Sequence, residues 1–508
     1  MKFLNAVLIA VVIFAGLLPQ VRAEQAPEVK QLVEKGLAAT KQEHWDEAIK
    51  CFNEARSRSP LDPSLVFNLA LACDRSRGRE MAAINCYLAY IALRPEAQNA
   101  DQVKKRVAEL EAKVETDARM LIKKSQELNE QMGDKQNCSH STLCTAQLEQ
   151  GDIDAALKTA ETNPEVYYTS KMNPYGDVAC ALAKAGRDPE AYQLKERLVR
   201  EAPDSDKQAV SDKILGKIVE GKAARGDFAG ALQDTLGITE DQRFYSYGWI
   251  SMRQVFAGDL PGALKSALLG SDPPFRAKSL LQVATKQAEA GDNVGALKTI
   301  AFAEEALSQI SAGNRSLTDV NRDMAQAYAA AGKIPEAIKA MERIGKEGYL
   351  DYSRGAAEAY ICAGQARLGA VEEAIKRAAG MKHAPSRNFA FSRIAEVQVK
   401  AKDFAGAERT IALIEDEATR LRSRSTLAEA QGRIAEAEAL GRQVSIVFDA
   451  LKEMESTAET LEKLKAEKPE EVASQLALNA YSRILFLNYQ RKNAETWEKK
   501  RREALSKK

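Results

Sequence analysis

The chain has 508 residues, of which 45% are hydrophobic but only 6% aromatic, and its formal net charge is +1. This length can bury a large core, and the abundance of Ala, Glu, Lys and Leu is typical of helices that pack closely through small residues. The near-neutral charge argues against a general nucleic-acid binder, which needs a clustered excess of Lys and Arg. We therefore expect an all-α protein with no nucleic-acid partner.

Residues 1–23 have the pattern of a secretory signal peptide. Lys2 supplies a basic start, residues 3–18 are largely apolar, and Val21 and Ala23 stand at the −3 and −1 positions of a cleavage site. The alternative is an uncleaved anchor, although about 16 apolar residues lie at the short limit for crossing a bilayer. We therefore expect cleavage, no membrane span after it, and an exported protein that is periplasmic or secreted.

A short phrase recurs along the rest of the chain. It consists of a glycine or polar turn residue, usually an apolar residue two positions later, and an alanine five positions later. Its copies begin at Glu43, Gly78, Gly151, Gly186, Gly226, Gly258, Gly291, Gly332, Gly369, Lys402 and Gly432, with steps mostly of 30 to 41 residues. A period in this range predicts an α-solenoid, in which each helical hairpin buries its apolar face by stacking on a neighbour.

The first two copies allow a comparison with a known repeat. Gly36 and Ala48 are small enough for two helices to approach closely, Phe52 fills the space beside them, and Pro60 ends the second helix. This pattern resembles the tetratricopeptide repeat (TPR), clearly over 29–96 and weakly, with a drifting period, over 146–440. The resemblance implies a solenoid that binds protein or peptide segments.

Five segments follow along the chain. The signal peptide (1–23) precedes the N-terminal TPR-like repeats (24–100), a connector (101–137), the repeat array (138–440) and a C-terminal helical cap with a basic tail (441–508). The cap region predicts about three helices, of which the apolar stretch 476–487 is expected to cover the last repeat. The basic tail is explained by a solvated helix end, or alternatively by contact with a membrane surface or an anionic polymer.

The connector reads as one long amphipathic helix, or two end to end. Its apolar stripe comprises Val107, Leu110, Val114, Leu121 and Leu128. This stripe could pack on the end of the first repeat pair or form a coiled-coil dimer seam. Asp117 and Lys124, at alternate seam positions, favour the first interpretation. The sequence sets no oligomeric state.

Two of the seven cysteines stand apart from the helical pattern. Cys138 and Cys144 flank a polar stretch that contains His140, whereas the others lie in apolar helical patterns and are expected to be small buried hydrophobes. In an oxidising compartment Cys138 and Cys144 could form a local disulfide, and the bridge and two free thiols both remain open. Their spacing with His140 matches no standard zinc motif, so we expect no metal site.

No short catalytic motif is present in the sequence. The three histidines are far apart, and the chain has no HExxH, GxSxG, Walker or GxGxxG pattern. We therefore assign no catalytic, cofactor-binding or metal-binding residue and expect neither enzyme activity nor a cofactor. A helical-toroid hydrolase with scattered carboxylates remains a third alternative, because carboxylate pairs leave no short motif.

Aromatic residues gather between Phe244 and Trp249. If Ala263 takes the small-residue position, the TPR resemblance places four residues where the family lines its concave groove and puts Tyr247 and Ile250 in the hairpin core. The four candidate groove residues are Tyr245, Met252, Val255 and Phe256. The alternative is ordinary packing between repeats.

These observations favour a non-enzymatic scaffold or adaptor in the cell envelope, which binds protein or peptide segments through a concave helical-repeat surface. The alternative is a helical accessory subunit of an envelope enzyme or transport system, which positions a polysaccharide, lipid or catalytic partner.

Overall fold

The computed structural model describes residues 26–132, 139–163, 168–311, 314, 316–345, 350–449 and 469–506. The described residues form helices joined by turns and contain no strand, which confirms the predicted all-α fold. The predicted signal peptide and Cys138 lie outside the described residues.

Two hairpins form the N-terminal part. The first pairs α2 (Pro27–Lys41) with α3 (Trp45–Arg58), and the second pairs α4 (Pro63–Arg75) with α5 (Glu80–Leu93). A Cβ atom added at Gly36 would come within 2.7 Å of the Phe52 ring, so the close approach of α2 and α3 requires glycine. The predicted contact between these two residues is confirmed.

The array consists of consecutive hairpins. Their first and second helices are α7 (Ser139–Glu149) and α8 (Ile153–Glu161), α9 (Tyr168–Lys184) and α10 (Asp188–Glu201), α11 (Lys207–Ala224) and α12 (Phe228–Thr235), α13 (Arg243–Ala257) and α14 (Leu260–Leu268), α15 (Pro273–Glu289) and α16 (Asn293–Ser308), α17 (Ser316–Ala330) and α18 (Ile334–Glu342), α19 (Leu350–Arg367) and α20 (Val371–Ala379), α21 (Ala384–Lys400) and α22 (Phe404–Ala412), and α23 (Glu417–Ala430) and α24 (Ile434–Asp449). A short 3₁₀ helix, η1 (Glu240–Gln242), precedes α13. Consecutive first helices from α9 onward contact one another extensively, and no comparably extensive contact joins consecutive second helices in the described array.

The alanine of the repeated phrase lies at the crossing of the two helices in every hairpin. Each of these alanines is completely buried: Ala48, Ala83, Ala156, Ala191, Ala231, Ala263, Ala296, Ala337, Ala374, Ala407 and Ala437. A larger side chain would force the paired helices apart, because interaxial distance depends on the residues at the contact. The close-packed hairpins predicted from the phrase are therefore confirmed.

The turn before each second helix requires a left-handed backbone. Gly258 ends α13 with φ of 82°, and the other phrase glycines adopt the same conformation. Glu43 and Lys402 take this position in their hairpins with φ of 57° and 61°, where a Cβ atom is unfavourable. These two hairpins are therefore strained where the others are relaxed.

A buried polar bracket joins the two helices of several hairpins. In the α15–α16 hairpin, Gln287 accepts a hydrogen bond of 2.8 Å from Thr299. Gln254 with Ser266 and Gln398 with Thr410 make the same contact, each at 2.7 Å. Asp292 and its equivalents cap the second helix by accepting a hydrogen bond from a backbone N–H three residues later. Because an unpaired amide would be costly inside a hairpin, the bracket sets the register of the two helices.

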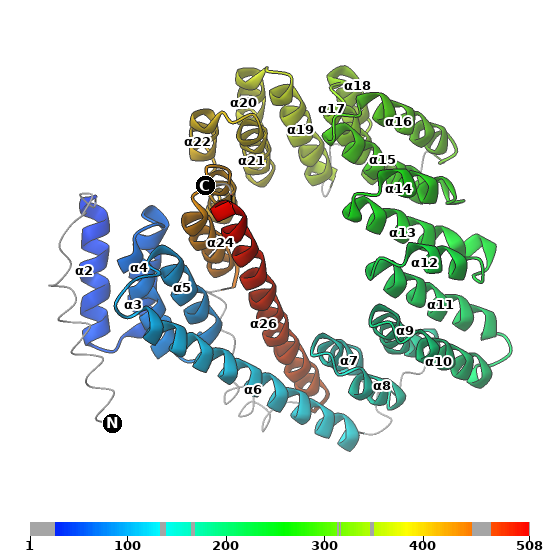
Figure 1. Ribbon diagram of the computed structural model, residues 1–508, viewed down its shortest axis with the longest axis horizontal. Coiled ribbons are helices and arrows are strands. Elements are labelled where there is room, and N and C mark those ends of the chain that lie inside the picture. Colours follow the sequence, from blue (N-terminus) through cyan, green and yellow to red (C-terminus); the bar gives the residue numbers. More distant parts are fainter. Residues whose placement is uncertain are drawn as a thin grey trace.

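The chain closes into a ring (Figure 1). The long connector α6 (Ala100–Met132) runs antiparallel to α26 (Pro469–Ser506), and α26 also contacts α7 at the start of the array. At the other end of the array, α24 contacts both α5 and α26. The N-terminal repeats therefore sit beyond the last hairpin of the array, although they precede its first hairpin in sequence.

The connector prediction is confirmed, since α6 is one helix of 33 residues. Its apolar stripe packs within the same chain, with Val107, Leu110 and Val114 against the N-terminal repeats and Leu121 against α7 and α26. Thus α26 occupies the face that a second copy would need for a coiled-coil seam.

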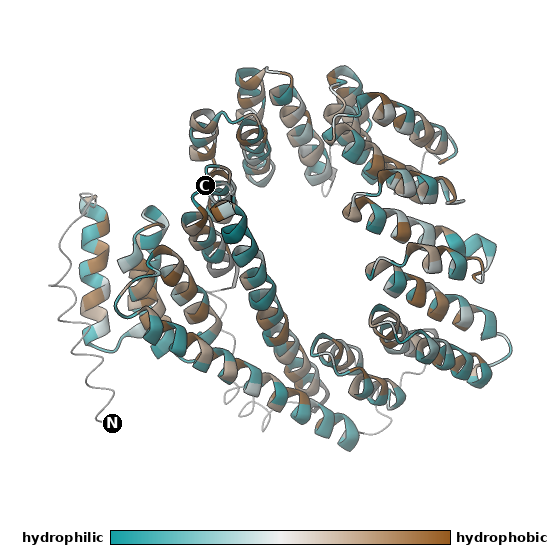
Figure 2. Cartoon of the chain, viewed as in Figure 1, coloured by the Kyte–Doolittle hydropathy of each residue, from teal (hydrophilic) through white to brown (hydrophobic). Residues whose placement is uncertain are grey.

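The C-terminal region differs from the prediction. Its described part comprises the end of α24, up to Asp449, and one helix of 38 residues, α26, which turns from apolar to polar toward its end (Figure 2). The apolar stretch around Leu476 and Ile484 packs on α6 and α7 at the start of the array, rather than on the last repeat. Trp497, near the end of α26, is the residue that covers the last repeat, against Leu421 and Leu440. The predicted placement was wrong for most of this stretch, because closure of the ring brings both ends of the array to one helix, although Leu487 at its end shares a cluster with Ala439 of α24. The number of helices stays a prediction, since residues 450–468 lie outside the described chain.

Candidate functional site

The predicted groove residues lie on the first helix α13, and they do not share one environment. Tyr245 and Phe256 are exposed, at 49% and 75%, whereas Met252 and Val255 are half-buried. The opposite face of α13 carries Tyr247 and Ile250, which are buried as expected. Side chains spaced at i, i+4, i+7 and i+11 share one face of a helix, so Tyr245, Trp249, Met252 and Phe256 form a line along α13 that faces away from α14. Val255 lies beside this line.

Phe275 extends the exposed surface onto the next first helix. Its ring centroid lies 4.9 Å from that of Tyr245 and 5.0 Å from that of Phe244. We call Tyr245, Trp249, Met252, Phe256 and Phe275 the aromatic stripe. Trp249 and Phe275 were not assigned to the groove from the sequence, although the spacing of Trp249 from Tyr245 and Phe256 could have identified it.

A cation borders the stripe. The Arg253 guanidinium lies 5.8 Å from the centre of the Trp249 ring. Among the described residues Arg253 forms neither a hydrogen bond nor an ion pair. Its Nε atom is buried without an acceptor. Arg253 is therefore a candidate contact for an acidic group on a partner.

Neighbouring charges on the first helices, in contrast, are neutralised. Lys217 of α11 lies 3.3 Å from Asp177 and 3.1 Å from Glu220. On α15, Lys286 lies 2.7 Å from Glu289. Burial opposes the ionisation of Glu289, but Lys286 outweighs it and lowers the pKa of this carboxyl. These carboxylates are therefore occupied by cations of the same chain.

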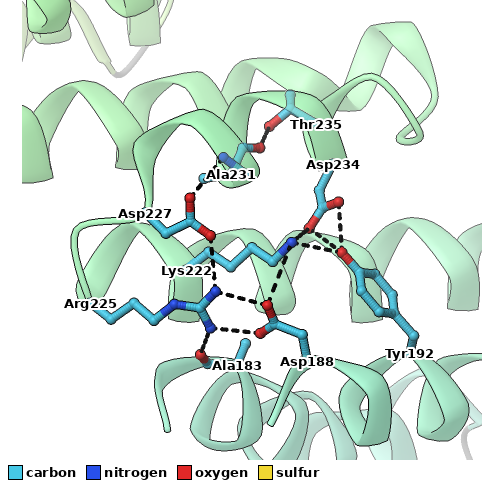
Figure 3. Close-up of polar contacts among 10 residues, drawn as sticks. Ala183, Asp188, Tyr192, Lys222, Arg225, Asp227, Ala231, Asp234 and Thr235 are labelled. Atoms are coloured by element: carbon cyan, nitrogen blue, oxygen red, sulfur yellow. Dashed lines mark hydrogen bonds and ion pairs between the residues drawn. The ribbon is translucent and has the colours of Figure 1, made fainter. Parts of the chain in front are cut away.

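A second cluster of charged groups links α10, α11 and α12 (Figure 3). The Lys222 ammonium lies 2.8 Å from Asp234 and 2.8 Å from the Tyr192 hydroxyl, which itself donates to Asp234 at 2.7 Å. Arg225 bridges Asp188, at 2.6 Å, to Asp227, at 2.9 Å. Lys222 and Asp234 occupy the positions of Gln and Ser or Thr in the polar bracket. The pair is therefore a charged form of this bracket and joins the two helices of its hairpin.

The protonation chemistry of this cluster agrees with a structural role. Burial raises the pKa of the Tyr192 hydroxyl. Burial opposes the charge on Lys222, but hydrogen bonds to Asp234 and Tyr192 outweigh it and raise the pKa of the ammonium. A general base at neutral pH needs a pKa near the working pH, and neither group is shifted in that direction.

Buried charges also occur where the ring closes. Arg56 of α3 is completely buried and donates hydrogen bonds to Glu417 of α23, at 2.7 Å, and to Gln443 of α24, at 3.1 Å. Nearby, Glu438 is buried between Arg442, at 3.1 Å, and Arg501, at 2.6 Å. Since Arg56 joins segments from opposite ends of the chain, we assign it to ring closure, whereas Glu438 and Arg501 hold α24 against α26. A cavity of about 300 Å³ beside this junction is lined by charges of both signs, including Asp46, Arg79 and Glu417.

The possible disulfide between Cys138 and Cys144 involves one residue, Cys138, that lies outside the described residues. Cys144 is buried, and its sulfur lies 3.6 Å from the carbonyl oxygen of Ala156 and 3.8 Å from that of Pro174. Burial raises the pKa of the Cys144 thiol to about 12. The bridge stays a prediction.

Two further features of the described chain concern metal binding and the crossing of a membrane. The described residues contain no group of three His, Cys, Asp or Glu side chains arranged to hold a metal ion. Among the helices of the described chain, none combines the length and the apolar character needed to cross a bilayer.

Comparisons with known proteins fall in two groups. No protein-family model matches the chain, and no curated protein matches it. Three similar solved structures are Naa15/Naa10 bound to HypK-THB (13% identity, 87% of this chain and 88% of that chain, TM-score 0.27), the TPR domain of P58(IPK) (15%, 79% and 97%, 0.17) and the APC/C hetero-tetramer Cut9–Hcn1 (13%, 89% and 97%, 0.22). By its own hairpins, the chain is a TPR-like α-solenoid that is closed into a ring.

Proposed function

We propose that the chain is a non-enzymatic scaffold that binds a protein segment on the first-helix face of its array, with the aromatic stripe as the anchor. The observation that carries this proposal is the exposure of Tyr245, Trp249 and Phe256 along one face of α13. Aromatic side chains of this kind dominate binding energy when a partner covers them. A preformed array adds affinity, because little conformational entropy is lost on binding.

We further propose that the scaffold works in the cell envelope after removal of residues 1–23. The support is the basic, apolar and small-residue pattern of the leader. Intact-mass measurement of the exported protein tests this point, and we expect a chain that begins at Glu24. A mature chain that keeps its first 23 residues would contradict the proposal.

The binding proposal is tested by affinity capture from envelope extract, followed by affinity measurement with purified variants. Phe256→Ser is expected to lower the affinity for the captured polypeptide at least about tenfold, because a buried aromatic anchor contributes about 2 kcal/mol. Its melting temperature should stay close to that of the wild type, since Phe256 is 75% exposed. Val294→Ser is the matched control, because Val294 is similarly exposed, at 68%, but begins a second helix.

Three results would contradict the proposal in different ways. Equal losses of affinity in Phe256→Ser and Val294→Ser would remove the stripe from the interface. Intact binding with a collapsed melting temperature in Met252→Ser would assign the stripe to repeat packing. Capture of a glycan or lipid in place of a polypeptide would favour the accessory-subunit alternative.

A further inference from the structure

We infer that the segment bound by the aromatic stripe is an acidic amphipathic helix with a carboxylate that meets Arg253. This inference rests on the proposed function, and it adds the shape and the charge of the partner. Two properties of the first-helix face carry it: the straight course of the stripe along α13, and the Arg253 guanidinium beside it, for which the described residues provide no anion.

The shape of the stripe suits a helix. Tyr245 and Phe256 are eleven positions apart on α13, which is about 16 Å at 1.5 Å per residue. An amphipathic helix presents apolar side chains with the same spacing and can lie along α13, as α11 and α15 already do on its two sides. An extended partner that adds to a sheet would need an exposed strand edge, and the described chain contains no strand.

The charge around the stripe is positive. On α11, α13 and α15, the face of the stripe corresponds to positions thirteen, nine, six, five and two residues before the turn glycine. These positions carry the cations Lys213, Lys217, Arg253, Lys278 and Lys286, against the carboxylates Glu220 and Glu289. Both carboxylates are already paired, with Lys217 at 3.1 Å and Lys286 at 2.7 Å, and Lys217 also lies 3.3 Å from Asp177 of α9. These two lysines are therefore engaged within the chain, whereas Arg253 can offer its charge to a partner. A partner that brings its own carboxylates therefore complements this face, whereas a basic partner would be repelled.

The balance of charge changes one repeat further on. One repeat further on, the same positions of α17 carry Asp319 and Asp323, which pair with Arg322 at 2.7 and 2.9 Å. The cations of α11, α13 and α15 therefore lie on the same part of the face as the aromatic stripe. Apolar anchoring and charge selection therefore act at the same place.

Arg253 is the residue that would favour an acidic partner over a neutral or basic one. Stacking on Trp249 at 5.8 Å supports the plane of the guanidinium, which can then offer its N–H groups to a carboxylate. Because the described residues provide Arg253 with no anion, a partner carboxylate would replace water without breaking an existing ion pair. A carboxylate one turn away from an apolar side chain on the partner helix would reach Arg253 while the apolar side chain covers Trp249.

The test is a selection with displayed peptides on the whole mature chain. The library consists of helical peptides of about 16 residues, with apolar residues at i, i+4, i+7 and i+11 and with Glu, Lys, Gln or Ser at the flanking positions. Peptides retained by the wild type but not by Phe256→Ser are collected, synthesised and measured for affinity. We expect Glu to outnumber Lys in them, and we expect their affinity to fall as salt rises.

The variants then separate the two levels of the proposal. Arg253→Gln should weaken a retained peptide about tenfold, because a charge-assisted hydrogen bond is lost, and Arg200→Gln, on the second helix α10, should not. If no peptide depends on Phe256, the proposed function fails and the acidic-helix inference fails with it. If the retained peptides are neutral or rich in Lys, or if Arg253→Gln leaves their affinity unchanged, the stripe still binds peptides but the inference is overturned. Dextran sulfate serves as a polyanion without apolar side chains. If it binds equally to the wild type and to Phe256→Ser and displaces the peptide, the inference is also overturned.

Discussion

Replacing the charged bracket of the α11–α12 hairpin with its neutral form should leave the local stability of the hairpin nearly unchanged, whereas breaking it should destabilise the hairpin. The Lys222 ammonium and the Asp234 carboxylate lie 2.8 Å apart, with side chains only 9% and 13% exposed. The equivalent positions in the α15–α16 hairpin hold Gln287 and Thr299 at the same separation of 2.8 Å. An ion pair in one hairpin and a neutral hydrogen bond in the other therefore occupy equivalent buried positions.

The magnitude follows from the burial of the pair. Lys222→Met keeps the volume of the side chain but leaves Asp234 with the Tyr192 hydroxyl alone, so we expect a loss of about 3 kcal/mol in local stability. The double variant Lys222→Gln with Asp234→Thr removes both charges and restores a neutral hydrogen bond. A buried ion pair replaced by a well-packed neutral pair is often stability-neutral, so we expect the double variant within about 1 kcal/mol of the wild type.

Hydrogen exchange measured by mass spectrometry is the suitable assay, because repeat arrays open locally and a single global transition is not assured. A loss of about 3 kcal/mol corresponds to exchange more than about 100-fold faster in α11 and α12. Lys286→Met is the matched control, since its pair with Glu289 is 48% and 23% exposed and should contribute less than about 1 kcal/mol. Equal effects of Lys222→Met and Lys286→Met would refute the reasoning, and so would a double variant as unstable as Lys222→Met.

The remaining predictions concern the turns, the closure of the ring, stability at low pH and the reactivity of buried cysteines. Lys402→Gly should stabilise its hairpin by up to about 1 kcal/mol in urea denaturation, because φ is 61° there, and Gly369→Ala should do the reverse. Arg56→Ala should leave Glu417 and Gln443 without their buried partner and cost about 3 kcal/mol at the ring junction, seen as faster exchange in α3 and α24; unchanged exchange would show that the ring closes without this residue. Hydrogen bonds from Arg225 lower the pKa of the Asp188 carboxyl below its usual value of about 3.9, so this stabilisation is present above about pH 4 and is lost as the pH falls through the folded-state pKa. Arg225→Gln should therefore remove this acid-dependent part of the urea midpoint. Burial raises the pKa of Cys144 and Cys362 to about 12, so both should react slowly with iodoacetamide at pH 8 until the chain is unfolded, and rapid labelling of folded Cys144 would contradict its burial.

Much of each hairpin could be predicted from the sequence. The turn glycine, the apolar residue that opens the second helix and the alanine at the crossing are local features, and each was placed correctly, as Gly258 and Ala263 illustrate. The bracket of Gln287 and Thr299 was missed, although glutamine four positions before the turn and a hydroxyl residue twelve positions later recur along the chain. The signal was present in the spacing of these polar residues, and no structural role was assigned to them.

The candidate site could be predicted only in part. A register drawn from one hairpin correctly separated the exposed Tyr245 and Phe256 from the buried Tyr247 and Ile250. It could not indicate that Phe275, thirty residues after Tyr245, packs against it, because that contact depends on how one hairpin stacks on the next. Nor could it indicate that Arg253 lacks an anion, since pairing depends on neighbours from other helices.

By itself, the sequence determined the hairpin, because every requirement of the hairpin lies within about 40 residues of chain: a glycine that tolerates positive φ, a small residue at the crossing and an apolar face. Only the tertiary structure decided that the array bends into a ring and that the N-terminal repeats follow its last hairpin. The physical reason is that curvature adds up from small rotations between many hairpins, and closure depends on pairs such as Arg56 with Gln443, which are 387 positions apart. No local pattern encodes a contact of that range.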